Sequence, residues 1–377
     1  MSFNKKGKEE VVLKTLNGVY TFLNQRYKAK KQGKFTSFLA LHTASLGQER
    51  GFQSKGLMEL LAYYTNHLSY REVEKLAERI VRQPVYTAKQ IQSKMVSLSV
   101  VAKEHLLEAY NGLQLCLNFV DGDIDLYASD SAEVHYFDDG VGVKRQKAKR
   151  KDKSYQKESK TVQTDIIVVQ KADNAHYYIA KSGNSTSAQN SLDSQIACHF
   201  SLHYPGKILP FVAITDGAKC IRERIERVFS KKALIILDWY HLRKKIWEQM
   251  SRLGLNKATK SAYATKILDE LWCGNIVDCL VFMEQEYLPL IRLDKRTIFE
   301  DLLGYLNKHK DEIIDYRTRY IIPKTIGSGR GEKANDQIVA IRQKNNGTAW
   351  SEAGSAALST LKCLQLNQQW DVFWAAA

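Results

Sequence analysis

The chain has 377 residues, of which 44% are hydrophobic and 26% charged, and Lys and Arg outnumber Asp and Glu by 56 to 41, a net charge of +15. This length and composition predict a soluble globular protein of two or three modules. No apolar stretch approaches the roughly 18–20 residues of a membrane span, which excludes a transmembrane protein, and the charged N-terminal residues exclude a secretory signal. The basic surplus favours a polyanionic partner, with nucleic acid ahead of an acidic membrane surface.

The six cysteines are scattered and never form a CxxC pair. That spacing argues against a zinc ribbon and against a disulfide scaffold. It suits a reducing compartment, so we expect a cytoplasmic protein.

The N-terminal third predicts a β element followed by helices. Residues 10–42 alternate in places, with Asn17-Gly18 as a hairpin signal, and predict a small basic β element within 1–50. Residues 51–112 read as three helices, with capping boxes at Ser69/Glu72 and Thr87/Gln90. Such an arrangement suits a helix-turn-helix whose third helix presents Lys89, Gln90 and Lys94 to DNA. A plain three-helix bundle with solvated charges is the alternative.

From about residue 115 the pattern predicts strands and then a βαβ unit. Nine Lys or Arg lie between 144 and 160, and we expect this run to hold DNA phosphates without reading sequence; its DNA-contacting members are Lys144, Arg145, Lys147, Lys149, Arg150 and Lys151. The apolar strands "LPFVAITDG" and "ALIILD" end at Asp216 and Asp238 with a helix between them, so they should be parallel neighbours. Strands, then a βαβ pair, then helices predict a mixed α/β (α+β) ribonuclease H-like core over 113–241, a helical insertion over 242–322, and C-terminal core helices over 323–377.

Acids at strand ends are the residues that can converge on one site. Asp216 ends a strongly apolar strand and is followed by Gly217, which lets a backbone turn sharply. An ordinary Asp-Gly turn with Asp216 as a helix N-cap is the alternative. Asp130 falls near the end of the first expected core strand. Its rivals are Asp121, Asp123, Asp125, Asp138 and Asp139, each of which is also explained as a solvated loop acid, and Asp165, which lies inside "TDIIVV".

Two further positions complete the set of candidates. Glu332 follows a glycine-rich turn and falls in the first turn of a helix, where the helix dipole favours an acid whatever its function. Asp238 and His241 follow the second apolar strand, but a lone histidine there is more often hydrogen-bonded structurally than bound to a metal.

These motifs together resemble a known family. "ITDGAKCIRERI" followed by "LIILDWYHLRKKI" resembles the second catalytic block of bacterial insertion-sequence transposases of the DD(E/D) ribonuclease H-like superfamily, with a (Cys/Asp)-x-x-His signature at Asp238 and His241. "IGSGRGEKANDQIVAIRQKN" looks like the terminal block that carries the glutamate, and "SDSAEVHYFDDGVGVKRQKAKR" is similar to the first block. The first block reads Asp130-Ser131, where Asp-Gly is more usual. The N-terminal β element and helices match the same family in the same order.

The resemblance implies a DNA transposase that cleaves element ends and transfers strands by phosphodiester chemistry. It implies Asp130, Asp216 and Glu332 as catalytic ligands of two Mg²⁺ ions, for which Mn²⁺ can substitute, with Asp238 and His241 in support. The partners implied are double-stranded DNA, namely terminal inverted repeats and target DNA, and a second copy of the chain in a homodimer or larger synaptic assembly at the nucleoid. A decayed or domesticated transposase that only binds DNA, and a ribonuclease H-like host nuclease, are the alternatives.

Overall fold

The computed structural model describes residues 3–31, 34–39, 52–113, 125–129, 133–147, 159–171, 174–183, 185–204, 211–230, 233–344 and 347–376. They form two compact units, one of Met1–Ala109, Gly142–Thr164 and Gln337–Ala377, the other of Tyr110–Val141 and Asp165–Asp336. The strands are β1 (Phe3–Thr15), β2 (Gly18–Lys31), β3 (Lys34–Leu39), β4 (Phe52–Gln53), β5 (Val134–Lys144), β6 (Thr161–Gln170), β7 (His176–Ser182), β8 (Phe211–Thr215) and β9 (Leu234–Leu237). The α-helices are α1 (Lys55–Thr65), α2 (Tyr70–Val81), α3 (Ala88–Glu108), α4 (Thr186–His203), α5 (Lys219–Phe229), α6 (Trp239–Arg252), α7 (Lys257–Trp272), α8 (Ile276–Phe282), α9 (Arg296–Lys308), α10 (Tyr316–Ile321), α11 (Gly329–Asn335), α12 (Ile341–Gln343), α13 (Glu352–Leu366) and α14 (Trp370–Ala376).

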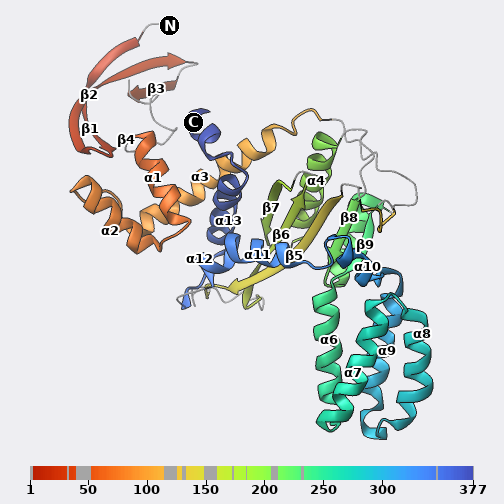
Figure 1. Ribbon diagram of the computed structural model, residues 1–377. Coiled ribbons are helices and arrows are strands. Elements are labelled where there is room, and N and C mark those ends of the chain that lie inside the picture. Colours follow the sequence, from red (N-terminus) through yellow and green to blue (C-terminus); the bar gives the residue numbers. More distant parts are fainter. Residues whose placement is uncertain are drawn as a thin grey trace. The chain divides into compact units, whose positions relative to one another are not determined.

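The first unit opens with a four-stranded sheet in the order β3-β2-β1-β4 (Figure 1). β1 and β2 pair antiparallel, and Thr15 lies opposite Gly18, so the expected hairpin is present with Leu16 and Asn17 as its loop. Each strand of this hairpin is long, which gives the basic N-terminal segment an extended backbone.

The helices α1, α2 and α3 of the same unit start where the sequence predicts. Both capping boxes are present. The Ser69 and Thr87 side chains each accept from the backbone N–H of the residue three positions on, and the side chain of that residue accepts from the backbone N–H of Ser69 or Thr87. The apolar faces of these helices share one core with α13 and α14, to which Leu361, Trp370 and Trp374 belong. The C-terminal helices therefore complete the N-terminal helical core.

The second unit is built on a five-stranded mixed sheet in the order β7-β6-β5-β8-β9. β5 pairs parallel with β8, and β8 pairs parallel with β9, which confirms the neighbouring parallel strands expected from the sequence. The short link between β6 and β7 permits only an antiparallel pair. Buried residues of α4 and α5 form a core with these strands that includes Phe200, Phe211 and Phe229. The protein is thus of the mixed α/β class.

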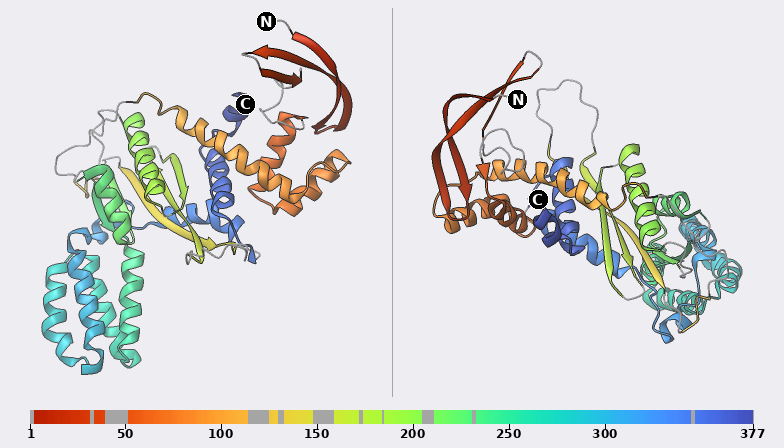
Figure 2. Two further views of the ribbon diagram at one scale, coloured as in Figure 1. Left: turned by 180° about the vertical axis from the view of Figure 1, so that it is seen from behind. Right: turned by 90° about the horizontal axis from the view of Figure 1, so that it is seen from above.

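Helices α6 to α10 follow β9 in this unit, as the sequence predicts for residues 242–322. α6, α7, α8 and α9 lie side by side as a bundle that extends from the end of β9 (Figures 1 and 2). Trp239 packs against Trp272 and Tyr316 at its root, with ring centroids 4.7 and 5.0 Å away, respectively. The Tyr316 hydroxyl donates to the carbonyl of Leu237 at 2.8 Å, which joins the bundle to the last strand.

Two negative findings apply to the described part of the chain. None of its helices is long and apolar enough to cross a membrane. The five cysteines within it, Cys198, Cys220, Cys273, Cys279 and Cys363, are free.

Candidate active site

One aspartate, Asp139, lies in strand β5, and another, Asp216, directly follows the neighbouring parallel strand β8. In the register of β5 and β8, Phe137 lies opposite Ile214, so continuing it by two residues sets Asp139 beside Asp216. Adjacent strands are about 4.8 Å apart, which brings these carboxylates within reach of one another. The strand β5 begins at Val134, so Asp130 precedes it and lies outside the described residues.

Alternation along β5 separates Asp139 from its neighbour Asp138. Asp138 shares a face with Tyr136, whose hydroxyl donates to it at 2.9 Å. Arg224 of α5 donates to both oxygens of Asp138 at 2.7 and 2.8 Å and to Asp165 at 2.7 Å. Two of the rival acids from the sequence are therefore partners of a buried arginine between the sheet and its helices. Asp139 points to the opposite face.

Helix α11 covers that opposite face and carries Glu332. A side chain on Gly331 would stand 3.4 Å from the Cβ of Phe137, so the backbone of α11 lies close above β5. The Asn335 amide donates to Asp139 Oδ2 at 2.5 Å, and Asp139 Oδ1 accepts from the backbone N–H of Gly140 at 2.7 Å. Glu332 lies in the first turn of α11, one turn before Asn335, as expected from the sequence.

Asp238 joins the start of α6 to the segment before α11. Its Oδ1 accepts from the backbone N–H groups of Tyr240 and His241 at 2.6 and 2.9 Å. Its Oδ2 accepts from both the backbone N–H and the hydroxyl of Ser328. A carboxylate offers about four lone-pair positions, and here all four have donors. Asp238 is therefore a helix cap and a tie between two segments.

His241 bridges this tie to Glu332. Its Nδ1 lies 3.4 Å from Asp238 Oδ2, and its Nε2 lies 3.7 Å from Glu332 Oε1. Burial alone would raise the pKa of Asp238, but the hydrogen bonds from His241 and Ser328 lower it to about 2. The pKa of His241 is raised, first by Asp238 and further by the charges of Asp216 and Glu332.

The same charges act on Asp139. Burial raises the pKa of its carboxyl group, and the negative charges of Asp216 and Glu332 raise it further, while His241 opposes them. Like charges have this effect only at short range in a partly buried site. Asp139, Asp216, Glu332 and His241 therefore form one electrostatic cluster, which we call the carboxylate edge.

The turn that holds Asp216 packs against His309, which follows helix α9. Asp216 is exposed, and its Oδ1 accepts from the backbone N–H of Ala218 at 2.8 Å. The N-cap of α5 is Ala218, so Asp216 shapes the turn before the helix instead of capping it. Gly217 has φ +82°, and a Cβ there would stand 2.8 Å from Cε1 of His309 and 3.0 Å from Cδ1 of Leu237.

His309 is held in place by Arg222 and Glu312. Its Nδ1 lies 2.6 Å from Glu312 Oε2 and 2.8 Å from Arg222 Nη2, and the arginine lies 2.5 Å from Glu312 Oε1. Arginine only donates and an ionised carboxylate only accepts. The consistent arrangement has His309 Nδ1–H donating to Glu312, with Arg222 bonded to the other oxygen.

A second buried ion cluster fixes the segment leading to α11. Arg319, which is fully buried, donates to both oxygens of Glu133 at 3.0 and 2.8 Å and to the carbonyl of Thr325. Lys324 donates to Glu133 at 2.8 Å. Burial alone would raise the pKa of Glu133, but hydrogen bonds from His135, Arg319 and Lys324 hold it well below its usual value.

The residues expected to contact DNA belong to the first unit. Lys89 and Gln90 are exposed in the first turn of α3, where the Gln90 side chain closes the capping box. Lys94 donates to Gln53 at 2.5 Å and lies over the Tyr86 ring. Lys144 and Lys147 are exposed, and Arg145 lies 3.6 Å from Glu352. Lys149, Arg150 and Lys151 lie outside the described residues.

The sequence predicts Asp130 as the first acid, which lies outside the described residues, and gives Asp139 as one rival among several. Asp139 is followed by Gly140, the Asp-Gly pair that is more usual in the first block of the resembling family. Asp139 also lies in a strand, two residues beyond a buried aromatic on the same face.

The donor set of the carboxylate edge consists of carboxylate oxygens with one imidazole beside them, which suits a hard divalent cation such as Mg²⁺. Within the described ranges, no three His, Cys, Asp or Glu side chains already surround one point. The Asp216 side chain is exposed, with its Oδ1 bonded to the Ala218 N–H, and that of Glu332 is 61% exposed, so both carboxylates are open to solvent.

No known protein family model matches the chain, and no curated protein matches it. Among solved structures, the chain is similar to the Drosophila P element transposase strand transfer complex, with 10% sequence identity, 88% of this chain and 85% of that chain covered, and a TM-score of 0.30. A similarity this weak identifies neither a fold nor a function.

Proposed function

We propose that the protein is a DNA transposase of the DD(E/D) type, in which Asp139, Asp216 and Glu332 form the catalytic set. The observation that carries the proposal is the carboxylate edge itself. Asp139 lies in β5, Asp216 directly follows its parallel neighbour β8, and α11 carries Glu332 near them, with Asn335 of α11 bonded to Asp139 and His241 3.7 Å from Glu332. The order of the sequence motifs supports the same assignment, with Asp139-Gly140 replacing Asp130-Ser131 in the first block.

The strand order also supports a ribonuclease H-like core for the second unit. Its three consecutive strands β5, β6 and β7 lie together, and the two strands of the βαβ unit follow on the other side of β5. The carboxylates of Asp139 in β5 and of Asp216 after the end of β8 then belong to one sheet. We propose that Glu332 completes the set from α11, a helix that is remote in sequence.

Each residue has a distinct part in the reaction. Mg²⁺ at this edge would supply charge stabilisation for the attacking and leaving oxygens of a phosphodiester. Asp139, Asp216 and Glu332 would hold the ions, and burial of Asp139 on the sheet fixes the direction of that carboxylate. Asp238 orients His241, and His241 restrains Glu332, so these two residues position the third acid. We propose that the basic residues of the first unit hold double-stranded DNA.

The test is strand cleavage and strand transfer on a duplex that carries the inverted repeats flanking the gene, with Mg²⁺ or Mn²⁺. We expect Asp139→Asn, Asp216→Asn and Glu332→Gln to abolish both reactions and Asp130→Asn to retain them. Asp301→Asn, which alters an exposed acid of α9, is the matched control. Full activity of Asp216→Asn or Glu332→Gln would sink the assignment, and loss in Asp130→Asn with retention in Asp139→Asn would restore Asp130 as the first acid.

The same assay separates the two alternatives. Binding of the repeats without nicking under any metal would identify a decayed or domesticated DNA-binding protein. Cleavage without joining, and without preference for the repeats, would identify a host nuclease.

A further inference from the structure

Helix α6 presents an exposed face that begins at the carboxylate edge. Tyr240, the second residue of the helix, is 58% exposed although its ring lies directly on Gly327, where a Cβ would stand 2.6 Å from its Cδ2. The same glycine position is 3.7 Å from Asp238 Oδ2. The Tyr240 ring therefore stands beside the Asp238–Ser328 tie, with its backbone N–H fixed by Asp238 and much of its ring open to solvent.

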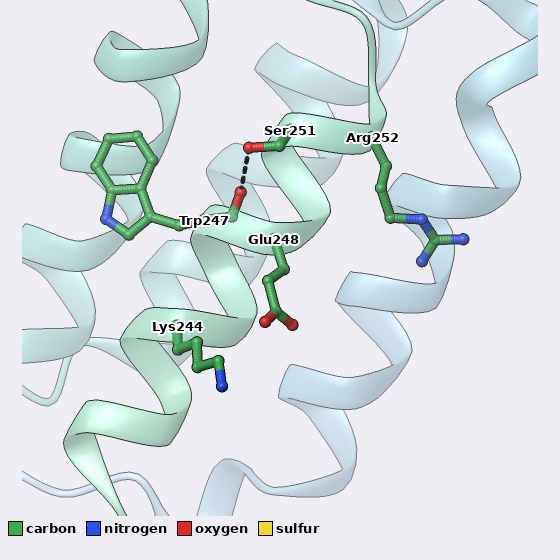
Figure 3. Close-up of a pocket in the computed structure, with 5 residues that line it drawn as sticks. All are labelled: Lys244, Trp247, Glu248, Ser251 and Arg252. Atoms are coloured by element: carbon green, nitrogen blue, oxygen red, sulfur yellow. Dashed lines mark hydrogen bonds between the residues drawn. The ribbon is translucent and has the colours of Figure 1, made fainter.

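The face continues along the helix with a basic, an aromatic and a hydroxyl side chain. Lys244, Trp247 and Ser251 follow Tyr240 at intervals of four, seven and eleven residues, which places all four on one stripe. We call this stripe the α6 track. With Glu248 and Arg252 beside them, Lys244, Trp247 and Ser251 line an open hollow of about 530 Å³ (Figure 3).

The charge of α6 indicates the kind of ligand. The helix carries four cations, Arg243, Lys244, Lys245 and Arg252, against one acid, Glu248. Lys244 is exposed. On this stripe an exposed tyrosine and a half-buried tryptophan alternate with an exposed cation and a hydroxyl.

We propose that the α6 track binds unpaired nucleotides of a DNA strand whose end lies at the carboxylate edge, an inference that rests on the proposed function. Aromatic rings stack on unpaired bases, and lysine neutralises the phosphate between them. From Tyr240 to Trp247 the helix rises about 10 Å, which matches about three bases stacked about 3.4 Å apart. Bases in an intact duplex already stack on each other, so the aromatic residues select for an unpaired strand.

The test measures binding of the full-length protein in EDTA, so that no cleavage occurs. The probes are a blunt hairpin duplex and the same hairpin with a short unpaired tail that carries 2-aminopurine, made in both polarities. Stacking should quench the 2-aminopurine on the wild type. Tyr240→Ala and Trp247→Ala should each weaken binding of the tailed probe about tenfold and leave the blunt probe unchanged, because stacking on one aromatic ring contributes on this scale.

Controls separate a binding role from a folding defect. Tyr320→Ala removes a tyrosine that is 65% exposed on α10 and should bind both probes like wild type. Abasic sites in the tail, which leave the protein unaltered, should weaken wild type but not add to the loss in Trp247→Ala. Equal weakening of blunt and tailed probes, or no abasic effect on wild type, would overturn the proposal in favour of duplex phosphate contacts. Tail-specific binding by a protein that never cuts DNA would support the track and refute only the proposed function.

Discussion

Replacement of Gly217 by alanine tests whether the helical insertion holds the turn that carries Asp216. The residue has φ +82°, a conformation that costs a side-chain-bearing residue about 1–2 kcal/mol. Its new Cβ would also stand 2.8 Å from His309 and 3.0 Å from Leu237, and overpacking of this kind typically costs about 1–3 kcal/mol. His309 is buried and bonded to Glu312, so it cannot swing aside freely. Together these contributions predict a loss of about 2–5 kcal/mol.

Gly254 offers the matched control in the same unit. It has φ +71°, and a Cβ there would meet nothing within 4 Å. Gly254→Ala therefore carries the backbone strain without the overpacking. The free energy of unfolding, measured in denaturant by circular dichroism, should fall about 1–3 kcal/mol further for Gly217→Ala than for Gly254→Ala. Strand cleavage should fall only for Gly217→Ala, since that turn carries Asp216. Equal losses of stability at the two glycines would show that His309 and Leu237 move aside without cost, and the reasoning would then be wrong.

Two further substitutions test the ties around the site. Asp238→Asn places an amide N–H₂ group against the Ser328 donors and should reduce activity about 10- to 100-fold. Metal binding, measured by Mn²⁺ titration, should stay near the wild-type level. Loss of metal binding as complete as in Asp216→Ala would make Asp238 a ligand. The pKa of Asp238 is about 2 in the folded protein against an ordinary 3.8. The ionised carboxylate therefore contributes about 2 kcal/mol to the free energy of unfolding above pH 4, and this contribution is lost as the pH falls toward 2. In Asp238→Asn the free energy of unfolding should depend less on pH between 4 and 2. Arg224→Met should lower the free energy of unfolding by about 3–5 kcal/mol, because it leaves the carboxylates of Asp138 and Asp165 without their cation. Arg227, on the same helix, has a side chain that is 49% exposed, and Arg227→Met should cost at most about 1 kcal/mol. Similar melting curves for the two arginine variants would contradict the buried network.

Local signals in the sequence predicted local structure well. The two capping boxes, the hairpin after β1, the parallel strands before Asp216 and Asp238, and the first-turn position of Glu332 all follow from residues a few positions apart. The packing of α13 and α14 against α1–α3 could not be predicted in this way. It joins segments at opposite ends of the chain, and an apolar pattern does not indicate which other segment it packs against.

The two adjacent acids of β5 show the same limit. Asp138 and Asp139 are adjacent, and composition does not distinguish them. Only the strand start at Val134 and the pairing of Phe137 with Ile214 decide which of them faces Arg224 and which faces Asp216. A shift of one residue in the register would exchange their roles.

Glu332 follows the whole helical insertion in sequence, so its position depends on how the two ends of that insertion are held together. Ser328 and Asp238, which close it, are 90 residues apart in sequence. Closing so long a loop loses chain entropy, but that loss grows only slowly with length. Three contacts offset it at one place: Asp238 holds Ser328, Tyr240 covers Gly327, and Arg319 holds the Thr325 carbonyl. Each of them acts on the segment just before α11. The backbone that leads into Glu332 is therefore fixed by residues at the root of the insertion and does not depend on the distal ends of α6 to α9.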